Sequence, residues 1–129
     1  MKPKEYLMRY RESMDRTKEI AQHLQELKAE AIKLKDHTGK SIALDDAVER
    51  YIDACNSAAA ELNALAAKRA EILGCIDSVQ SKTQRAVLYQ RYIIGYSWER
   101  IAVEMNYCIR QVQRIHGRAL LSAAKHIRQ

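Results

Sequence analysis

The spacing of apolar residues over positions 4–36 predicts one long helix. No Gly or Pro follows Pro3 in this stretch, and apolar side chains recur every three or four positions. They are Ile20, Leu24, Leu27, Ala31 and Leu34, preceded in the same rhythm by Tyr10, Met14 and Thr17. This pattern is one side of a helix of about 33 residues, roughly 50 Å long. Residues 36–41 then predict a stop and a turn, with Gly39 suited to a left-handed cap.

A second long helix is expected from near Asp45 to Leu73, with Gly74 ending it. Its apolar residues follow a heptad pattern, as in coiled coils. The predicted seam consists of Leu44, Val48, Tyr51, Cys55, Ala58, Leu62 and Leu65. Two long helices joined by a short turn form an antiparallel hairpin. Because such a hairpin buries little surface alone, we expect residues 1–76 to act as an oligomerisation arm. A hairpin folded onto the rest of its own chain is the alternative.

After Gly74 the pattern changes to a polar connection over residues 77–81 and a shorter helix from about Lys82 to Ile94. The apolar positions of this helix are Ala86, Val87, Tyr89, Tyr92 and Ile93. Gly95 supplies the next turn.

Residues 97–116 have the pattern of a helix-turn-helix. Ser97 is a good helix N-cap, and Ile101 and Met105 lie four apart on one face. Ala102 is small enough for two crossing helices, and Asn106 tolerates the left-handed dihedrals of a sharp turn. Val112 and Ile115 then face the core from the next helix. Together these features predict a helix, a tight turn and a second helix that crosses the first.

The fold class predicted is therefore all-α. It comprises a long antiparallel helical hairpin over residues 1–76 and a three-helix helix-turn-helix domain over residues 77–129. The charge follows the same division: residues 1–76 carry 13 Lys+Arg and 13 Asp+Glu, whereas residues 77–129 carry 9 and 3. The whole net charge of +6 thus lies in the second part, which predicts that only this part meets a polyanion.

The outward side chains of the last predicted helix are those that DNA reading needs. They are Arg110, Gln111, Gln113 and Arg114. Arg bonds bidentately to guanine edges and Gln to adenine edges. No Asp or Glu lies between Met105 and the last residue, and Arg118, Lys125 and Arg128 extend the positive charge along the helix. We expect double-stranded DNA as the partner, and a solvated basic helix face is the alternative.

Residues 83–88, 91–102 and 110–120 resemble region 4 of bacterial sigma factors, which reads promoters. The motifs are Thr-Gln-Arg-Ala-Val-Leu, Arg-Tyr-Ile-Ile-Gly-Tyr-Ser-Trp-Glu-Arg-Ile-Ala and Arg-Gln-Val-Gln-Arg-Ile-His-Gly-Arg-Ala-Leu. The chain is more similar still to phage and prophage late-transcription regulators of the ArpU type. Such regulators pair this module with a helical N-terminal segment. The resemblance covers roughly residues 77–122.

The resemblance implies a set of DNA contacts. Arg110, Gln111, Gln113 and Arg114 would read the major groove, Ile109 would touch a base methyl, and Arg85 and Arg118 would touch phosphates. Cys108 stands where the family usually has a Ser or Thr cap, so we expect a weak cap on the recognition helix. No segment resembles the core-binding region of a sigma factor. RNA polymerase is kept as a candidate partner, without recruitment in the manner of a whole sigma factor.

The function expected is that of a sequence-specific transcriptional regulator that binds double-stranded DNA, encoded by a phage or prophage. We expect a homodimer in the cytoplasm of a bacterial host, at the nucleoid. The alternative is a DNA-recognition subunit of phage packaging, like a small terminase subunit, which also joins a helix-turn-helix to an oligomerising hairpin. A ring of eight or more subunits would favour packaging, and a dimer would favour a regulator.

Other classes fit the sequence less well. No Gly-rich phosphate loop and no Ser with a nearby His and acid are present, so we expect no enzyme and no catalytic residue. The three cysteines and four histidines lack metal-ligand spacing, so we expect neither a metal nor another cofactor. No charge-free apolar run approaches the roughly 20 residues of a membrane span, and no signal peptide opens the chain. We expect a reducing compartment and buried or half-buried thiols.

Overall fold

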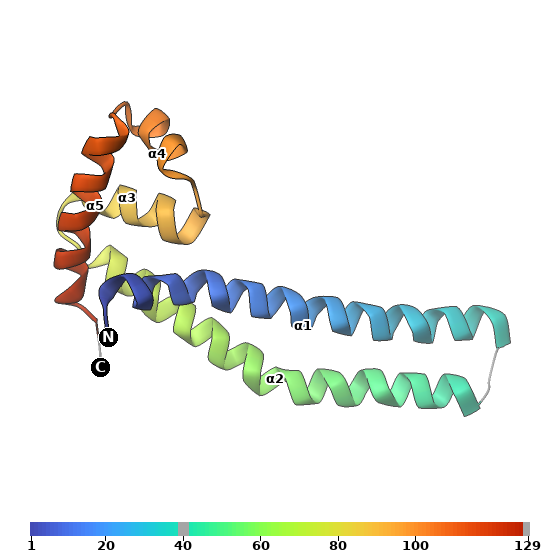
Figure 1. Cartoon of the computed structure of the whole chain (residues 1–129). Helices are drawn as coiled ribbons and strands as arrows, with labels where there is room; N and C mark the ends of the chain where they lie inside the picture. Colours follow the sequence, from blue (N-terminus) through green and yellow to red (C-terminus); the bar gives the residue numbers. More distant parts are fainter. Residues whose placement is uncertain (39–41, 128–129) are drawn as a thin grey trace. The chain divides into compact units, whose positions relative to one another are not determined.

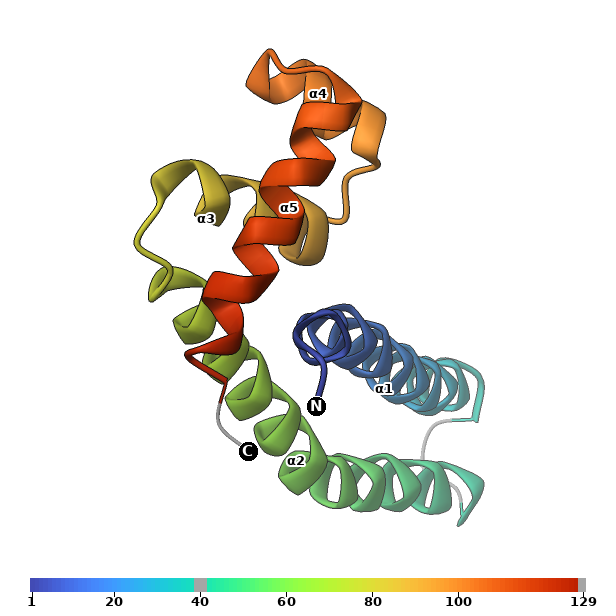
Figure 2. The ribbon, with the colours of Figure 1, turned by 60° about the vertical axis from the view of Figure 1, so that its left-hand side comes forward.

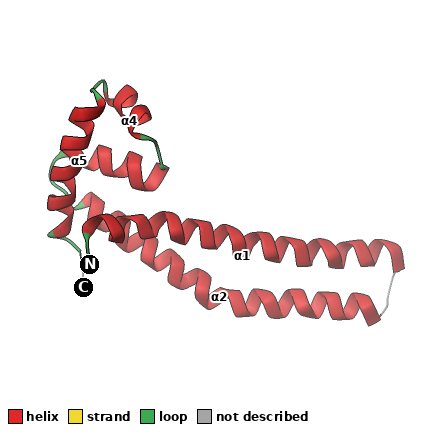
Figure 3. Cartoon of the chain, viewed as in Figure 1, coloured by secondary structure: helices red, strands yellow, loops and turns green. Residues whose placement is uncertain are grey.

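The computed structural model describes residues 1–38 and 42–127, and in these ranges every regular element is helical (Figures 1 and 3). The elements are α1 (Pro3–Thr38), α2 (Ile42–Asp77), α3 (Lys82–Leu88), the π-helical segment η1 (Tyr89–Ile94), α4 (Trp98–Met105) and α5 (Ile109–Ala124). The all-α class is thereby confirmed. The cap predicted at Gly39 lies outside the described residues, as does Arg128.

The chain divides into two compact units, which are described separately. The hairpin unit spans residues 14–66. The head unit combines residues 1–13 with the chain from Ala67 onward. The predicted boundary at residue 76 does not coincide with this division. Side chains from the beginning of α1 and the end of α2 belong to the same core as the short helices, and this burial draws them into the head unit.

In the hairpin unit, α1 and α2 run side by side in opposite directions (Figures 1 and 2). Two ion pairs join them: Arg16 Nε lies 2.7 Å from Glu61 Oε1, and Arg50 Nη2 lies 3.1 Å from Glu30 Oε1. Both pairs are exposed, so each contributes little to stability.

On both helices of this unit, the residues predicted to form the apolar side are less exposed than their neighbours. Val48 is the exception, with 40% of its surface exposed. Even so, burial is shallow. Of the side chains described between residues 14 and 66, Ile20 and Ala47 are buried, and the rest are half-buried or exposed. The hairpin unit therefore has little apolar core of its own.

The head unit contains the larger core. Its buried members come from α1, the end of α2, the following turn, α3, η1 and α5. They are Tyr6, Leu7, Ile72, Cys75, Ile76, Val79, Leu88, Tyr92, Ala119 and Ala123. This core explains why the prediction that Gly74 ends the second helix was wrong. Burial of Cys75 and Ile76 stabilises the helical continuation to Asp77 by more than the roughly 1 kcal/mol that a helical Gly costs.

Arg69 continues the heptad spacing of α2 beyond Leu65, but it is a polar residue. Its guanidinium Nη1 donates a hydrogen bond to Ser13 Oγ at 3.0 Å, and Ser13 is itself buried. A polar pair thus replaces an apolar one where α1 and α2 enter the head unit.

The helix predicted over residues 82–94 is divided into α3 and η1. The end of η1 is tightly closed, because the Gly95 and Tyr96 amides both donate to Gln90 O, at 3.0 and 2.9 Å. Tyr89 was predicted on the apolar side, but it is 46% exposed. Leu88 and Tyr92, four positions apart, form the buried side of this segment, and Tyr89 follows Leu88 by about 100° around the helix.

Arg11 fixes the end of η1 from the beginning of α1. Its Nη1 donates to Ile93 O at 3.2 Å and to Ile94 O at 3.1 Å, which are carbonyls left without a helical partner. Gly95 follows with φ +90°, and an added Cβ would come within 2.9 Å of the Arg11 guanidinium carbon. The positive φ therefore favours glycine here, and a Cβ would also displace the guanidinium of Arg11 from its present position.

A second core lies among α3, α4 and α5, and α5 packs against both other helices (Figure 2). Its buried members are Val87, Ile101, Ala102 and Val112. Ala102 is 8% exposed, which confirms that a small residue occupies the crossing. Tyr96, Trp98, Met105, Tyr107 and Ile115 close the periphery of this core.

We predict that Ala102→Leu lowers the free energy of unfolding by about 1–3 kcal/mol, because three extra carbons would overfill the crossing of α4 and α5. Val103→Leu is the matched control, since Val103 is the next residue and is 72% exposed. This control should change stability by less than about 0.5 kcal/mol. Denaturant unfolding followed by circular dichroism measures both. Equal stability of Ala102→Leu and the parent protein would mean that the crossing has room to spare.

Candidate nucleic-acid interface

The turn between α4 and α5 has the geometry of a Schellman motif. Asn106 adopts φ 57° and ψ 40°, and it is the only non-glycine residue with positive φ in the described ranges. Its amide donates to Val103 O at 3.3 Å, and the Tyr107 amide donates to Ala102 O at 3.0 Å. These bonds satisfy carbonyls at the end of α4, so the chain reverses in few residues. The left-handed turn predicted at Asn106 is confirmed.

The two helices of the motif begin differently. Ser97 caps α4, since its Oγ accepts a hydrogen bond from the Arg100 amide at 3.2 Å, as predicted. Cys108 occupies the same position before α5 with extended dihedrals, φ −78° and ψ 159°, but its thiol makes no capping hydrogen bond. The weak cap expected at Cys108 is confirmed. The expectation of buried or half-buried thiols is wrong for this residue, because Cys108 is exposed.

The polar residues predicted to face DNA lie on one exposed surface of α5. Val112, His116, Ala119 and Ala123 form the buried side of this helix. The exposed residues predicted to contact DNA are Ile109, Arg110, Gln111, Gln113, Arg114 and Arg118 on α5, with Lys125 directly after its end. We call this surface the recognition face.

The recognition face combines positive charge with hydrogen-bonding groups and lacks acidic residues. The acids nearest in sequence are Glu99 and Glu104 on α4, and Arg100 Nε lies 3.0 Å from Glu104 Oε1. Ile109 begins the helix and is 39% exposed, so an apolar side chain stands at the tip of this surface. The face can donate hydrogen bonds to anionic oxygens or to base edges, which are the two requirements of DNA binding.

Arg85 lies apart from this set. It projects from α3, and its Nη1 donates to Val79 O at 2.6 Å and to Gln80 O at 2.9 Å. The guanidinium therefore holds the turn between α2 and α3. The phosphate contact that the resemblance implies for Arg85 stays a prediction, and the structure adds a clear intramolecular role.

A cluster of rings and one cation, which the sequence did not reveal, holds α5 against η1 and α4. The His116 Nε2 atom lies 2.6 Å from the Tyr92 hydroxyl oxygen, and its ring meets Trp98 edge-on at a centroid distance of 4.7 Å. The Arg91 guanidinium lies 4.2 Å above the Trp98 ring, in a cation–π contact. The three rings come from three separate elements, so no local period connects them.

Burial, followed by the nearby positive charges of Arg91 and Lys4, lowers the pKa of His116 to about 4. The imidazole is therefore neutral at physiological pH. It supports α5 from the inside and adds no charge to the recognition face. Trp98 is half-buried within this cluster.

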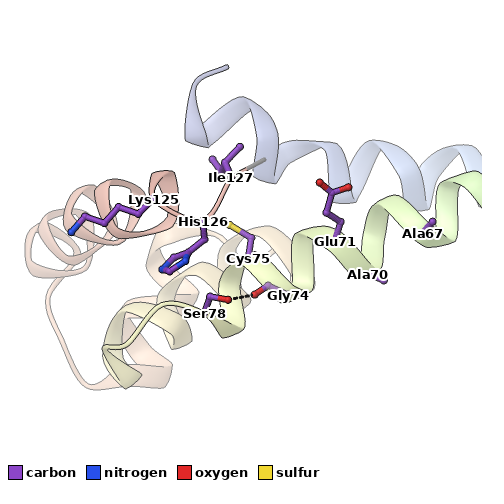
Figure 4. A pocket seen from close by; sticks show the side chains of 9 residues that line it. All are labelled: Ala67, Ala70, Glu71, Gly74, Cys75, Ser78, Lys125, His126 and Ile127. Atoms are coloured by element: carbon purple, nitrogen blue, oxygen red, sulfur yellow. Dashed lines mark hydrogen bonds between the residues drawn. The ribbon is translucent and has the colours of Figure 1, made fainter. Parts of the chain in front are cut away.

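An open groove of about 790 Å³ lies elsewhere in the head unit, beside the end of α2 (Figure 4). One hydroxyl and one thiol are among the groups that line it, and both are hydrogen-bonded within the head unit. Ser78 Oγ donates to Gly74 O at 2.8 Å, and Cys75 Sγ donates to Ala123 O at 3.5 Å. Burial, and to a lesser extent Glu71, raises the pKa of the Cys75 thiol, which favours the unreactive protonated form.

Residues 1–38 and 42–127 contain no group of three His, Cys, Asp or Glu side chains that could hold a metal ion. No helix in these ranges combines the length and apolarity that crossing a membrane requires. No protein-family model, curated protein or solved structure matches the chain.

We predict that Cys108→Ser raises the free energy of unfolding by about 0.5–1.5 kcal/mol, because a hydroxyl can accept the amide hydrogen of Gln111. The matched control is Ser97→Ala, which removes the corresponding bond at α4 and should cost about the same amount. Thermal and denaturant unfolding give both values. If Cys108→Ser proved neutral while Ser97→Ala was destabilising, the first turn of α5 would not be limited by its cap.

Proposed function

We propose that the chain is a sequence-specific transcriptional regulator that binds double-stranded DNA through α5. The observation that carries this proposal is the recognition face, a row of Arg and Gln side chains on a helix held by a helix-turn-helix turn. Such a helix fits the major groove of B-DNA, where Arg and Gln distinguish base pairs. The confinement of the net charge to residues 77–129 supports the same partner.

The residues of the face divide into two roles by their place along α5. Arg110, Gln111, Gln113 and Arg114 lie in its first two turns, which enter the groove in helix-turn-helix proteins, so these residues would read bases. Ile109 would contact a thymine methyl group there. Arg118 and Lys125 lie farther along the helix and would bind phosphates, which position the protein without specifying sequence.

The resemblance to ArpU-type regulators and to sigma region 4 supports a role in phage or prophage transcription. It suggests RNA polymerase as a further partner and the bacterial nucleoid as the place of action. The alternative of a packaging subunit shares the same DNA-binding surface and differs in assembly. The oligomeric state therefore discriminates between the two functions.

We propose a homodimer formed through the hairpin unit. One helix-turn-helix contacts only a few base pairs. When two of them are linked in a dimer, binding of the first raises the effective concentration of the second at the DNA, and the overall affinity increases. One flank of α2, beside the seam, carries an exposed apolar stripe, which consists of Val48, Ile52, Ala59 and Ala66. Residues 1–76 are neutral, so a second copy meets no net repulsion. The shallow burial of the hairpin unit also favours a partner that covers this stripe.

The first test of the proposal is DNA binding as a function of salt. If each protomer of a dimer meets some 3–5 phosphates, affinity should fall on the order of a thousand-fold between 50 and 200 mM salt. Fluorescence anisotropy with a duplex that the protein selects from a random pool measures this. Absence of binding at low salt would contradict the proposal.

Substitutions on α5 separate the two roles in the same assay. Arg114→Ala should weaken the selected site by about 1–3 kcal/mol and relax base choice, whereas Arg118→Ala should weaken all sequences alike. The matched control is Lys33→Ala, which removes one exposed positive charge from the hairpin unit and should leave binding unchanged. A changed preferred sequence in Arg118→Ala but not in Arg114→Ala would reverse the assignment.

A further prediction concerns the apolar stripe. Sedimentation at tens of micromolar should show a dimer, and Ile52→Glu should convert it to a monomer by placing a charge on the stripe. Ile52 is 51% exposed, so its substitution spares the hairpin itself. The matched control is Ala60→Glu, away from the stripe on α2 by helical spacing, which should remain dimeric. A monomeric parent protein would contradict the dimer, and a ring of many subunits would favour the packaging function.

A further inference from the structure

Gly117 occupies an unusual place for a glycine. It lies in the interior of α5, and it is exposed. An added Cβ would meet no atom within 4 Å, so packing within the protein does not require a glycine. Among the glycines of the described ranges, only Gly95 has a positive φ. The backbone conformation at Gly117 therefore does not require a glycine either. Glycine lowers helix stability relative to alanine, and nothing inside the head unit offsets that loss.

The position of Gly117 on the helix suggests that a binding partner, and not the protein itself, explains the glycine. At 3.6 residues per turn, Gly117 projects within about 20° of Arg110 and about 60° of Arg114. It lies about 160° from the buried Ala119 by the same geometry. Gly117 is therefore close to the centre of the recognition face, one turn beyond the residues proposed to read bases.

Space in the major groove is limited. A helix with its side chains measures roughly 10–12 Å across, and the groove is roughly 12 Å wide. The first turns of the helix fill the groove with Arg110 and Arg114, so the next turn on the same face passes the sugar–phosphate strand that borders it. Glycine is the residue that permits close approach of a backbone to a ligand.

We propose that Gly117 is the point of closest approach between the backbone of α5 and a DNA sugar–phosphate strand. Its missing side chain lets the helix lie deep enough for Arg114 to reach base edges. Arg118, the next residue, is placed to neutralise the phosphate at this contact. Gly117 is thus a positioning residue that sets the depth of the recognition helix, and this inference rests on the proposed DNA-binding function.

The chain offers a matched control for this idea. Gly74 also lies inside a helix and is exposed, and a Cβ added there would meet no atom within 4 Å, but it belongs to α2. Alanine at either site should raise the melting temperature, because alanine favours the helix. A difference in DNA binding between the two variants therefore reports the environment of α5 and not helix stability.

The experiment measures melting temperature and DNA affinity of full-length Gly117→Ala and Gly74→Ala, with the duplex selected by the parent protein. We expect both variants to melt higher than the parent. Gly117→Ala should bind about ten-fold or more weakly, whereas Gly74→Ala should bind as the parent does. The slope of log affinity against log salt should be unchanged in Gly117→Ala, because no charge is lost.

The possible results separate this inference from the function on which it rests. If the parent protein binds DNA and Gly117→Ala binds equally well, the inference is overturned and the proposed function stands. If Gly117→Ala melts below the parent, the fold itself requires the glycine, and the inference is also overturned. If the parent protein does not bind DNA, the proposed function fails and the inference fails with it.

Discussion

The left-handed turn at Asn106 is the constraint on which the proposed interface depends. Because Tyr107 N donates to Ala102 O at 3.0 Å, α5 must begin within a few residues of the end of α4. The two helices then cross at Ala102, where any larger side chain would push them apart. This crossing turns Val112 inward and leaves Arg110 and Arg114 outward. The chemistry of the recognition face therefore follows from one backbone conformation and one small residue.

The parts of this arrangement that the sequence predicted are those encoded locally. Ser97 and Asn106 form hydrogen bonds to residues three or four positions away, and the thiol of Cys108 forms no such bond with the first turn of α5. The roles of these three residues can therefore be inferred from their neighbours alone. The apolar rhythm likewise assigns Val112 to the buried side of α5 and Arg114 to the exposed side, because a helical period depends only on spacing. The backbone geometry of such a short motif is determined by neighbouring residues. Both the helix-turn-helix and its exposed face could therefore be predicted from the sequence.

The parts that the sequence did not predict depend on partners far along the chain. Gly74 suggests a helix end, but burial of the residues after it outweighs the local preference for a stop. Arg85 has the type and position of a phosphate ligand, yet Val79 O and Gln80 O accept its hydrogen bonds. Arg11 reaches Ile93 O across more than eighty positions in the sequence, and no local pattern connects them. The same kind of long-range burial explains why residues 1–13 belong to the head unit.

The two units differ in how far they depend on an outside surface. In the head unit, Tyr92, Trp98 and His116 hold α5 from the inside, so the DNA binding that we propose would use a surface that is already ordered. Among the described side chains of the hairpin unit, burial is limited to Ile20 and Ala47, and exposed ion pairs such as Arg16–Glu61 add little stability. Apolar surface on α2 is therefore left for a further contact. The DNA binding and the self-association that we propose are physically compatible, because the buried residues that fix α5 are not those of the exposed stripe on α2.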